Sequence, residues 1–231
     1  MPGLERELST QLERRGESAR FVVATLDPLY QDRLEHLGYL SIGNDRFATR
    51  WFRYSSSVPR YYERFAGSIE RMVLQSACLV QIPWQDALLE FLRRVDGSGV
   101  HWWLYGSAAL AVRGIDVEPG DIDISVSDAE LLGTIFDDLL VTPVEHLEGW
   151  VAERIGRAYH EAIIEWVSEP HAANDDPTEP LEYGSLISSR LQTVQWGGHR
   201  IRVPPLSVQL ASCENRGLAD RANLIRDAMA R

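Results

Sequence analysis

Two aspartates separated by one isoleucine begin a short apolar run, Asp121-Ile122-Asp123-Ile124. Residues i and i+2 of a strand point to the same face, so the two carboxylates project together while the isoleucines pack on the other side. Carboxylates on one face repel each other unless a cation neutralises them. Mg2+ takes oxygen ligands and usually keeps waters and substrate phosphates in its shell. The spacing therefore indicates a metal site of the kind that supports phosphoryl chemistry.

A glycine–serine pair, Gly106-Ser107, precedes the first aspartate, with thirteen residues between them. It follows an expected strand at 102–105 and precedes an expected short helix at 108–113. Glycine lets the backbone approach a ligand closely, a helix N-terminus offers N–H groups to an anion, and the serine adds a hydroxyl donor. We expect this turn to meet a phosphate beside the aspartates. A simple turn without phosphate contact is the alternative for Ser107.

The surrounding pattern predicts the elements that position these residues. Strict alternation predicts a strand at 122–126, and an apolar run predicts another at 162–167. A Gly-Gly pair between two β-like runs predicts a hairpin within 191–203. Two helices are expected at about 206–215 and 218–229.

Residues 1–82 look helical and irregular, with an amphipathic helix expected at 58–74 because apolar residues recur there every three or four positions. No linker precedes Pro83, so we expect 1–82 to be an extension docked onto a domain at 83–231. The predicted fold class is α+β. It consists of a mixed β-sheet flanked by helices, an N-terminal mainly helical extension and C-terminal helices.

The order Tyr105-Gly106-Ser107, a gap, then Asp121 to Ile124 closely resembles the signature of the polymerase β-like nucleotidyltransferase superfamily. The stretch YGSAALAVRG…PGDIDI is most similar to its small bacterial members, antibiotic nucleotidyltransferases among them. The resemblance covers roughly 85–231. It implies a nucleotidyltransferase fold and transfer of a nucleoside monophosphate from an NTP, with ATP favoured, to an acceptor hydroxyl. It also implies Mg2+ as cofactor, held by Asp121 and Asp123.

The resemblance further implies a third carboxylate on a neighbouring strand, for which Glu165 is the match, although aspartate is commoner there. Glu165 would complete the metal shell or accept the proton of the acceptor; a structural ion pair is the alternative. In the closing helices of the family a basic residue often meets the nucleotide phosphates. Arg216 and Arg221 are the candidates, although the usual residue is lysine. Solvated positions with helical pairing are the alternative for both.

The composition restricts the partners. The chain has 231 residues and a net charge of -11, and its basic residues are all arginine, so lysine chemistry is excluded. This acidity argues against a broad nucleic-acid footprint, which depends on many contacts between basic residues and phosphates. Residues 46–71 nevertheless combine six arginines, two glutamates and seven aromatic residues. Such a segment binds single-stranded nucleic acid by stacking or packs against the domain at 83–231, and packing against that domain is favoured.

We therefore expect an enzyme with an NTP and an unidentified acceptor as partners, and a small-molecule acceptor is favoured. A transferase acting on RNA or protein is an alternative, and so is a non-catalytic nucleotide-binding protein on the same fold. No apolar run approaches the ~20 residues of a membrane span, and the N-terminus lacks the apolar region of a signal peptide. Two cysteines suggest no disulfide framework. These features predict a cytoplasmic protein without a membrane partner.

Overall fold

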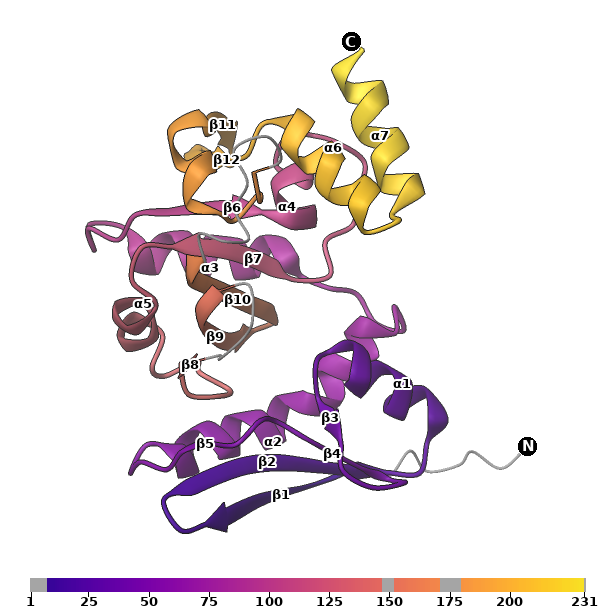
Figure 1. Ribbon diagram of the computed structural model, residues 1–231, viewed down its shortest axis with the longest axis vertical. Coiled ribbons are helices and arrows are strands. Elements are labelled where there is room, and N and C mark those ends of the chain that lie inside the picture. Colours follow the sequence, from indigo (N-terminus) through magenta and orange to yellow (C-terminus); the bar gives the residue numbers. More distant parts are fainter. Residues whose placement is uncertain (1–7, 147–151, 171–179, 231) are drawn as a thin grey trace. The chain divides into compact units, whose positions relative to one another are not determined.

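The computed structural model describes residues 8–146, 152–170 and 180–230 (Figure 1). The chain forms two compact units: unit 1 is made of residues 1–82 and 139–143, and unit 2 of residues 83–138 and 144–231. Docking of 1–82 onto the rest of the chain stays a prediction. None of the described helices is long and apolar enough to cross a membrane.

Unit 1 is built on an antiparallel sheet with two helices. Its strands are β1 (Leu8–Arg15), β2 (Ser18–Thr25), β3 (Leu40–Ser41), β4 (Arg46–Ala48) and β5 (Phe52–Arg53). Its helices are α1 (Pro28–His36) and α2 (Val58–Ser76). The expectation of a mainly helical or irregular N-terminal region is therefore wrong where β1 to β5 lie, whereas the helix expected at 58–74 is confirmed.

The core of unit 1 lies between the sheet and α2. Phe21 of β2 is fully buried, and its ring centroid lies 5.1 Å from those of Phe52 in β5 and Phe65 in α2. The hydroxyls of Thr10 in β1 and Tyr62 in α2 are 3.1 Å apart. These contacts show that α2 covers one face of the sheet. They assign Phe52, Tyr62 and Phe65 of the 46–71 segment to packing within unit 1, whereas packing of this segment against the domain at 83–231 stays a prediction.

Unit 2 contains a mixed five-stranded sheet in the order β6-β7-β10-β9-β8, in which β7 and β10 are parallel and the other pairs antiparallel. Its strands are β6 (Trp102–Tyr105), β7 (Ile122–Val126), β8 (Glu145–His146), β9 (Ala152–His160) and β10 (Ala162–Pro170). A separate hairpin joins β11 (Gln192–Trp196) to β12 (His199–Val203).

The helices of unit 2 are α3 (Trp84–Val95), α4 (Gly106–Ala111), α5 (Ala129–Ile135), α6 (Leu206–Asn215) and α7 (Ala219–Met229), with a 3-10 helix η2 (Ser185–Arg190). This arrangement confirms the α+β class. The predicted strands at 102–105 and 122–126, the hairpin and both C-terminal helices are also confirmed. The short helix begins at Gly106, two residues earlier than expected. β9 was not predicted.

A buried tryptophan anchors the β9–β10 pair. Trp166 of β10 is fully buried, and its indole Nε1 donates to the Ala129 carbonyl at 3.2 Å. The ring lies directly over Gly156, its register partner on β9. A Cβ at position 156 would come within 2.1 Å of the indole, a distance that packed atoms do not adopt. Only glycine leaves room for this ring.

We predict that Gly156→Ala destabilises unit 2 by about 1–3 kcal/mol, because overpacking a filled core forces strain. Gly67→Ala is the matched control. Gly67 is an exposed position inside α2, and a Cβ added there would meet open space, so alanine should stabilise unit 1 by about 1 kcal/mol. Chemical denaturation of each variant measures both effects. An unchanged midpoint for Gly156→Ala would contradict the packing described.

Candidate active site

One row of side chains crosses the sheet of unit 2. Tyr105 of β6 pairs with Asp123 of β7, Asp123 with Glu165 of β10, and Glu165 with Arg157 of β9. Directly opposed residues on neighbouring strands share a face of the sheet. Asp121, two residues before Asp123, projects to the same face. The sheet therefore brings the carboxylates near the start of β7 together with Glu165 and Arg157, which lie more than thirty residues later in the sequence.

Burial and mutual repulsion act on the two aspartates. The pKa of Asp121 lies at about 6, above its usual 3.8, because burial disfavours the charged form and the charge of Glu165 adds to this. The pKa of Asp123 is raised well above its usual value, first by burial and then by the charges of Asp121 and Glu165. Arg216 opposes both shifts.

This pair of oxygen donors fits a divalent cation. Each carboxylate is half-buried and repelled by its neighbours, and a hard cation between them would remove both penalties. The protein ligands that fit such a cation are two, Asp121 and Asp123. Over residues 8–146, 152–170 and 180–230, no three His, Cys, Asp or Glu side chains are arranged as a metal-holding cluster. Metal binding by Asp121, Asp123 and Glu165 together stays a prediction.

Glu165 is held by an arginine. Its Oε2 accepts hydrogen bonds from Nε and Nη2 of Arg157, at 2.8 and 2.5 Å. The structural ion pair that was the alternative for Glu165 is therefore present, with Arg157 as its partner. Arg157 itself lies close enough to Asp121 to lower that group's pKa, so the pair belongs to the site and is not remote from it. A role of Glu165 in the metal shell or in proton transfer stays a prediction.

Gly106 lies against Asp123. Its φ is +65°, a conformation that side chains rarely adopt, and a Cβ there would lie 2.3 Å from Asp123 Oδ2. Its N–H donates to Oε2 of Glu182 at 3.1 Å. The amide expected to face a phosphate is therefore engaged by a side chain of the protein. Ser107 is only 4% exposed, and its contact with phosphate stays a prediction.

Glu182 is a site residue that the sequence did not reveal. It is 7% exposed, and its Oε1 accepts from Ser212 Oγ at 2.8 Å. Its backbone carbonyl accepts from Trp103 Nε1 at 2.9 Å. Gln209 Nε2 donates to the Gly106 carbonyl at 3.1 Å and lies 3.5 Å from Glu182 Oε2. Glu182 therefore ties the Gly106 turn to α6, and its charge contributes to the raised pKa of Asp123.

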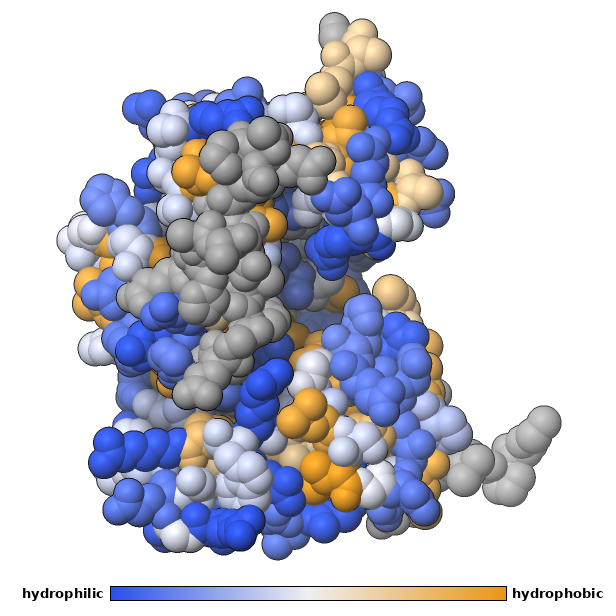
Figure 2. Space-filling view, viewed as in Figure 1, coloured by the Kyte–Doolittle hydropathy of each residue, from blue (hydrophilic) through white to orange (hydrophobic). Residues whose placement is uncertain are grey.

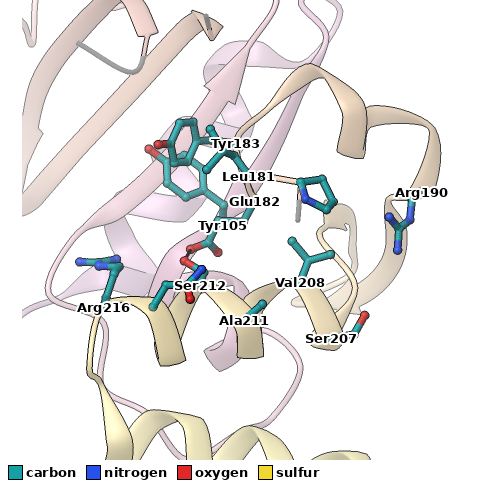
Figure 3. A pocket seen from close by; sticks show the side chains of 12 residues that line it. Tyr105, Leu181, Glu182, Tyr183, Arg190, Ser207, Val208, Ala211, Ser212 and Arg216 are labelled. Atoms are coloured by element: carbon teal, nitrogen blue, oxygen red, sulfur yellow. Dashed lines mark hydrogen bonds between the residues drawn. The ribbon is translucent and has the colours of Figure 1, made fainter. Parts of the chain in front are cut away.

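A cavity of about 520 Å3 opens beside Glu182 (Figure 3). The rings of Tyr105 and Tyr183 lie at one side of it, with centroids 5.4 Å apart. In Figure 3, Arg216 and Arg190 lie at opposite ends, with α6 along the floor. The remaining lining residues are Pro180, Leu181, Glu182, Ser207, Val208, Ala211, Ser212 and Asn215. The cavity is thus lined by apolar side chains and by the guanidinium groups of Arg190 and Arg216. Tyr105 connects it to the row of side chains that crosses the sheet.

The two predicted phosphate-binding arginines are placed differently. Arg216 ends α6, is exposed, and lines the cavity. Arg221 lies in α7 and is half-buried; it acts on Asp121 through its charge but does not line the cavity. The structure therefore brings Arg216 to the cavity and leaves phosphate contact by Arg221 a prediction.

No family model matches this sequence, and no curated protein matches it. Solved structures do resemble the fold. A candidate nucleotidyltransferase from Thermotoga maritima is 18% identical, with a TM-score of 0.46, over 65% of this chain and 96% of that one. ANT(2'')-Ia in complex with adenylyl-2''-tobramycin is 13% identical, with a TM-score of 0.42, over 63% and 89%. A solution structure of the antibiotic-resistance factor ANT(2'')-Ia is 16% identical, with a TM-score of 0.38, over 63% and 91%.

We predict that Asp121→Asn raises the melting temperature in buffer with a chelator at pH 7.5. The folded pKa of Asp121 exceeds the unfolded one, so the stability that its protonated form contributes is complete below about pH 4 and lost as the pH rises through 6. Asparagine stays neutral, so its advantage should grow between these values to at most about 3 kcal/mol. Asp116→Asn, an exposed neighbour, is the control. A gain independent of pH would contradict this account.

Proposed function

We propose that this protein is an enzyme that transfers a nucleoside monophosphate from an NTP to an acceptor hydroxyl and releases pyrophosphate. The observation that carries the proposal is the close approach of the Gly106 turn to Asp123, with Asp121 immediately before β7. A glycine turn followed by the Asp-Ile-Asp run is the signature on which the resemblance rests, and here the turn lies against Asp123. Its chemistry suits a phosphorylated ligand and a divalent cation.

Mg2+ is the proposed cofactor, and Asp121 and Asp123 are the residues that would hold it. When bound, it would neutralise charge on the phosphates. The protein contributes mainly positioning and a preorganised field. The strand pairing of β6, β7 and β10 fixes the carboxylates relative to one another, and Glu182 fixes the turn. Glu165 is proposed as the group that completes the metal shell or takes the acceptor's proton.

The cavity beside Tyr105 is the proposed place of the nucleotide. Its volume of about 520 Å3 lies within the range of small-molecule sites, about 300–1,000 Å3. Tyr183 and Val208 offer aromatic and aliphatic surface to a base, and Arg216 offers a guanidinium to the phosphates. ATP is the favoured donor, and a small molecule is the favoured acceptor. A non-catalytic nucleotide-binding protein is the alternative, and it predicts binding without transfer.

We predict that the protein, incubated with each α-labelled NTP, Mg2+ and a panel of small molecules, tRNA and cell lysate, transfers label to one acceptor class. Asp123→Asn should lower transfer by about 10^2–10^3-fold, the usual loss when one preorganised charge is removed from a site. Asp116→Asn, with the same change of charge on the surface, should leave transfer unchanged. Full activity of Asp123→Asn would overturn the two-carboxylate mechanism; nucleotide binding without any transfer would favour the alternative.

A pair of variants separates the two roles of Glu165. Glu165→Gln removes the carboxylate and its ion pair, whereas Arg157→Gln removes the ion pair and keeps the carboxylate. If Glu165 takes part in chemistry, Glu165→Gln should lower the turnover by at least ten-fold more than Arg157→Gln does. The nucleotide affinity of Glu165→Gln should remain near that of the wild type. Equal losses in both variants would assign Glu165 to structure alone.

A further inference from the structure

The sheet of unit 1 presents a charged face opposite to α2. Glu13 of β1 pairs with Arg20 of β2, and Arg20 donates from Nε to Glu13 Oε2 at 2.8 Å. Nη2 of Arg46 on β4 reaches Glu13 Oε1 at 2.5 Å. The side chains that contact α2, Thr10 and Phe21, belong to the alternate positions of the same strands. The charged residues therefore occupy the other face.

The same face continues toward the β1–β2 turn. Arg15 lies two positions after Glu13 on β1 and pairs with Ser18 of β2, which in turn pairs with Arg53 of β5. Both arginines are exposed. Trp51 is 42% exposed, and the Arg20 guanidinium lies 4.5 Å from its ring centroid. We call Arg15, Arg20, Arg46, Trp51 and Arg53 the open face.

Charge is distributed unequally along the chain. Residues 83–231 hold 24 acidic residues and 12 arginines, whereas residues 1–82 hold 10 acidic residues and 11 arginines. The open face has four arginines, and the carboxylate of Glu13 lies among them. In Figure 2 the lower margin, where β1 and β2 lie in Figure 1, is mostly hydrophilic. The net charge of -11 therefore hides a locally cationic surface, and such asymmetry is typical of proteins that bind polyanions.

Two arginines of the open face, Arg20 and Arg46, are held in place by Glu13. Glu13 accepts from both of them, and its pKa is lowered chiefly by its hydrogen bond to Arg20. Trp51 supports the Arg20 guanidinium from one side. Guanidinium groups fixed in this way lose little freedom when they bind a phosphate with two hydrogen bonds. The half-exposed indole offers a flat apolar surface on which a base can stack.

We propose that the open face binds single-stranded nucleic acid. The arginines would contact successive phosphates, and Trp51 would stack on an unpaired base. A duplex hides its bases inside the helix, so it would gain only the phosphate contacts. A membrane surface would also attract arginine and tryptophan, but the exposed large apolar side chains on this side of the sheet, Trp51 and Leu40, are only two among the charged groups, which suits a base better than an acyl chain. This binding stands apart from nucleotidyl transfer and needs neither NTP nor metal.

The test is fluorescence anisotropy with labelled U12, dT12 and a 12-base-pair duplex, in 50 mM salt with a chelator and no NTP. The wild type should bind both single strands at least ten-fold more tightly than the duplex. Tighter binding of U12 than of dT12 would identify RNA as the ligand; equal binding would leave DNA and RNA equivalent, and both results support the proposal. No binding of either single strand, equal binding of the duplex, or binding only to anionic vesicles would overturn it.

Variants then locate the surface. Arg15→Gln/Arg53→Gln should weaken U12 binding at least ten-fold and reduce the dependence of log affinity on log salt by about 1.4, from two lost contacts of about 0.7 each. Trp51→Ala should weaken it about ten-fold, and Trp51→Phe should restore most of the loss. Arg200→Gln, an exposed arginine on β12 of unit 2, is the control and should change nothing. If the open-face variants bind like the wild type, the proposal is wrong even where the protein binds RNA.

Discussion

The close approach of the Gly106 backbone to the Asp123 carboxylate is the constraint on which the rest of unit 2 depends. It requires glycine at 106, because a Cβ would collide with Oδ2, and it requires a backbone φ of +65°. Glu182 holds the other side of the turn through the Gly106 N–H. The turn is thus fixed between two carboxylates, one that would hold a cation and one that anchors it to α6. The contact with Asp123 depends on the register of β6 and β7, which places Tyr105 opposite Asp123.

Placing several carboxylates close together lowers the stability of unit 2. Neighbouring arginines and the packing around the site compensate for this loss. Burial is the first cause of the raised pKa values of both aspartates, and repulsion by neighbouring carboxylates is the second. Arg157 neutralises Glu165 by direct hydrogen bonds, whereas Arg216 and Arg221 act on Asp121 through their charge. The buried Trp166 and the paired strands supply the packing that keeps the site assembled. A site that concentrates like charges lowers the stability of the folded protein, and such a loss is expected where function requires those charges.

The site could be predicted from sequence where its geometry is local. The spacing of Asp121 and Asp123 follows from the two-residue period of a strand, and the Gly106 turn from the conformational freedom of glycine. The in-register pairing of Glu165 with Asp123 depends on β7 and β10 being neighbours, which only the resemblance suggested. Glu182 gave no signal because its partners lie in β6 and α6. β1 was missed because its sequence LSTQLERR is polar and exposed, and the tertiary pairing with β2 decides its conformation.

The strand order of unit 2 has a consequence for how the protein folds. β9 and β10 are joined by a turn at Glu161 and can pair early, because little chain must be ordered to bring them together. The parallel pair of β7 and β10 joins segments about forty residues apart, and such non-local pairing is slow. Asp123 meets Glu165 only at that step. During synthesis, β7 leaves the ribosome before the β9–β10 hairpin does. Asp123 therefore has no Glu165 opposite it until β10 has been made. The row of side chains from Tyr105 to Arg157 is therefore complete only once β7 has paired with β10.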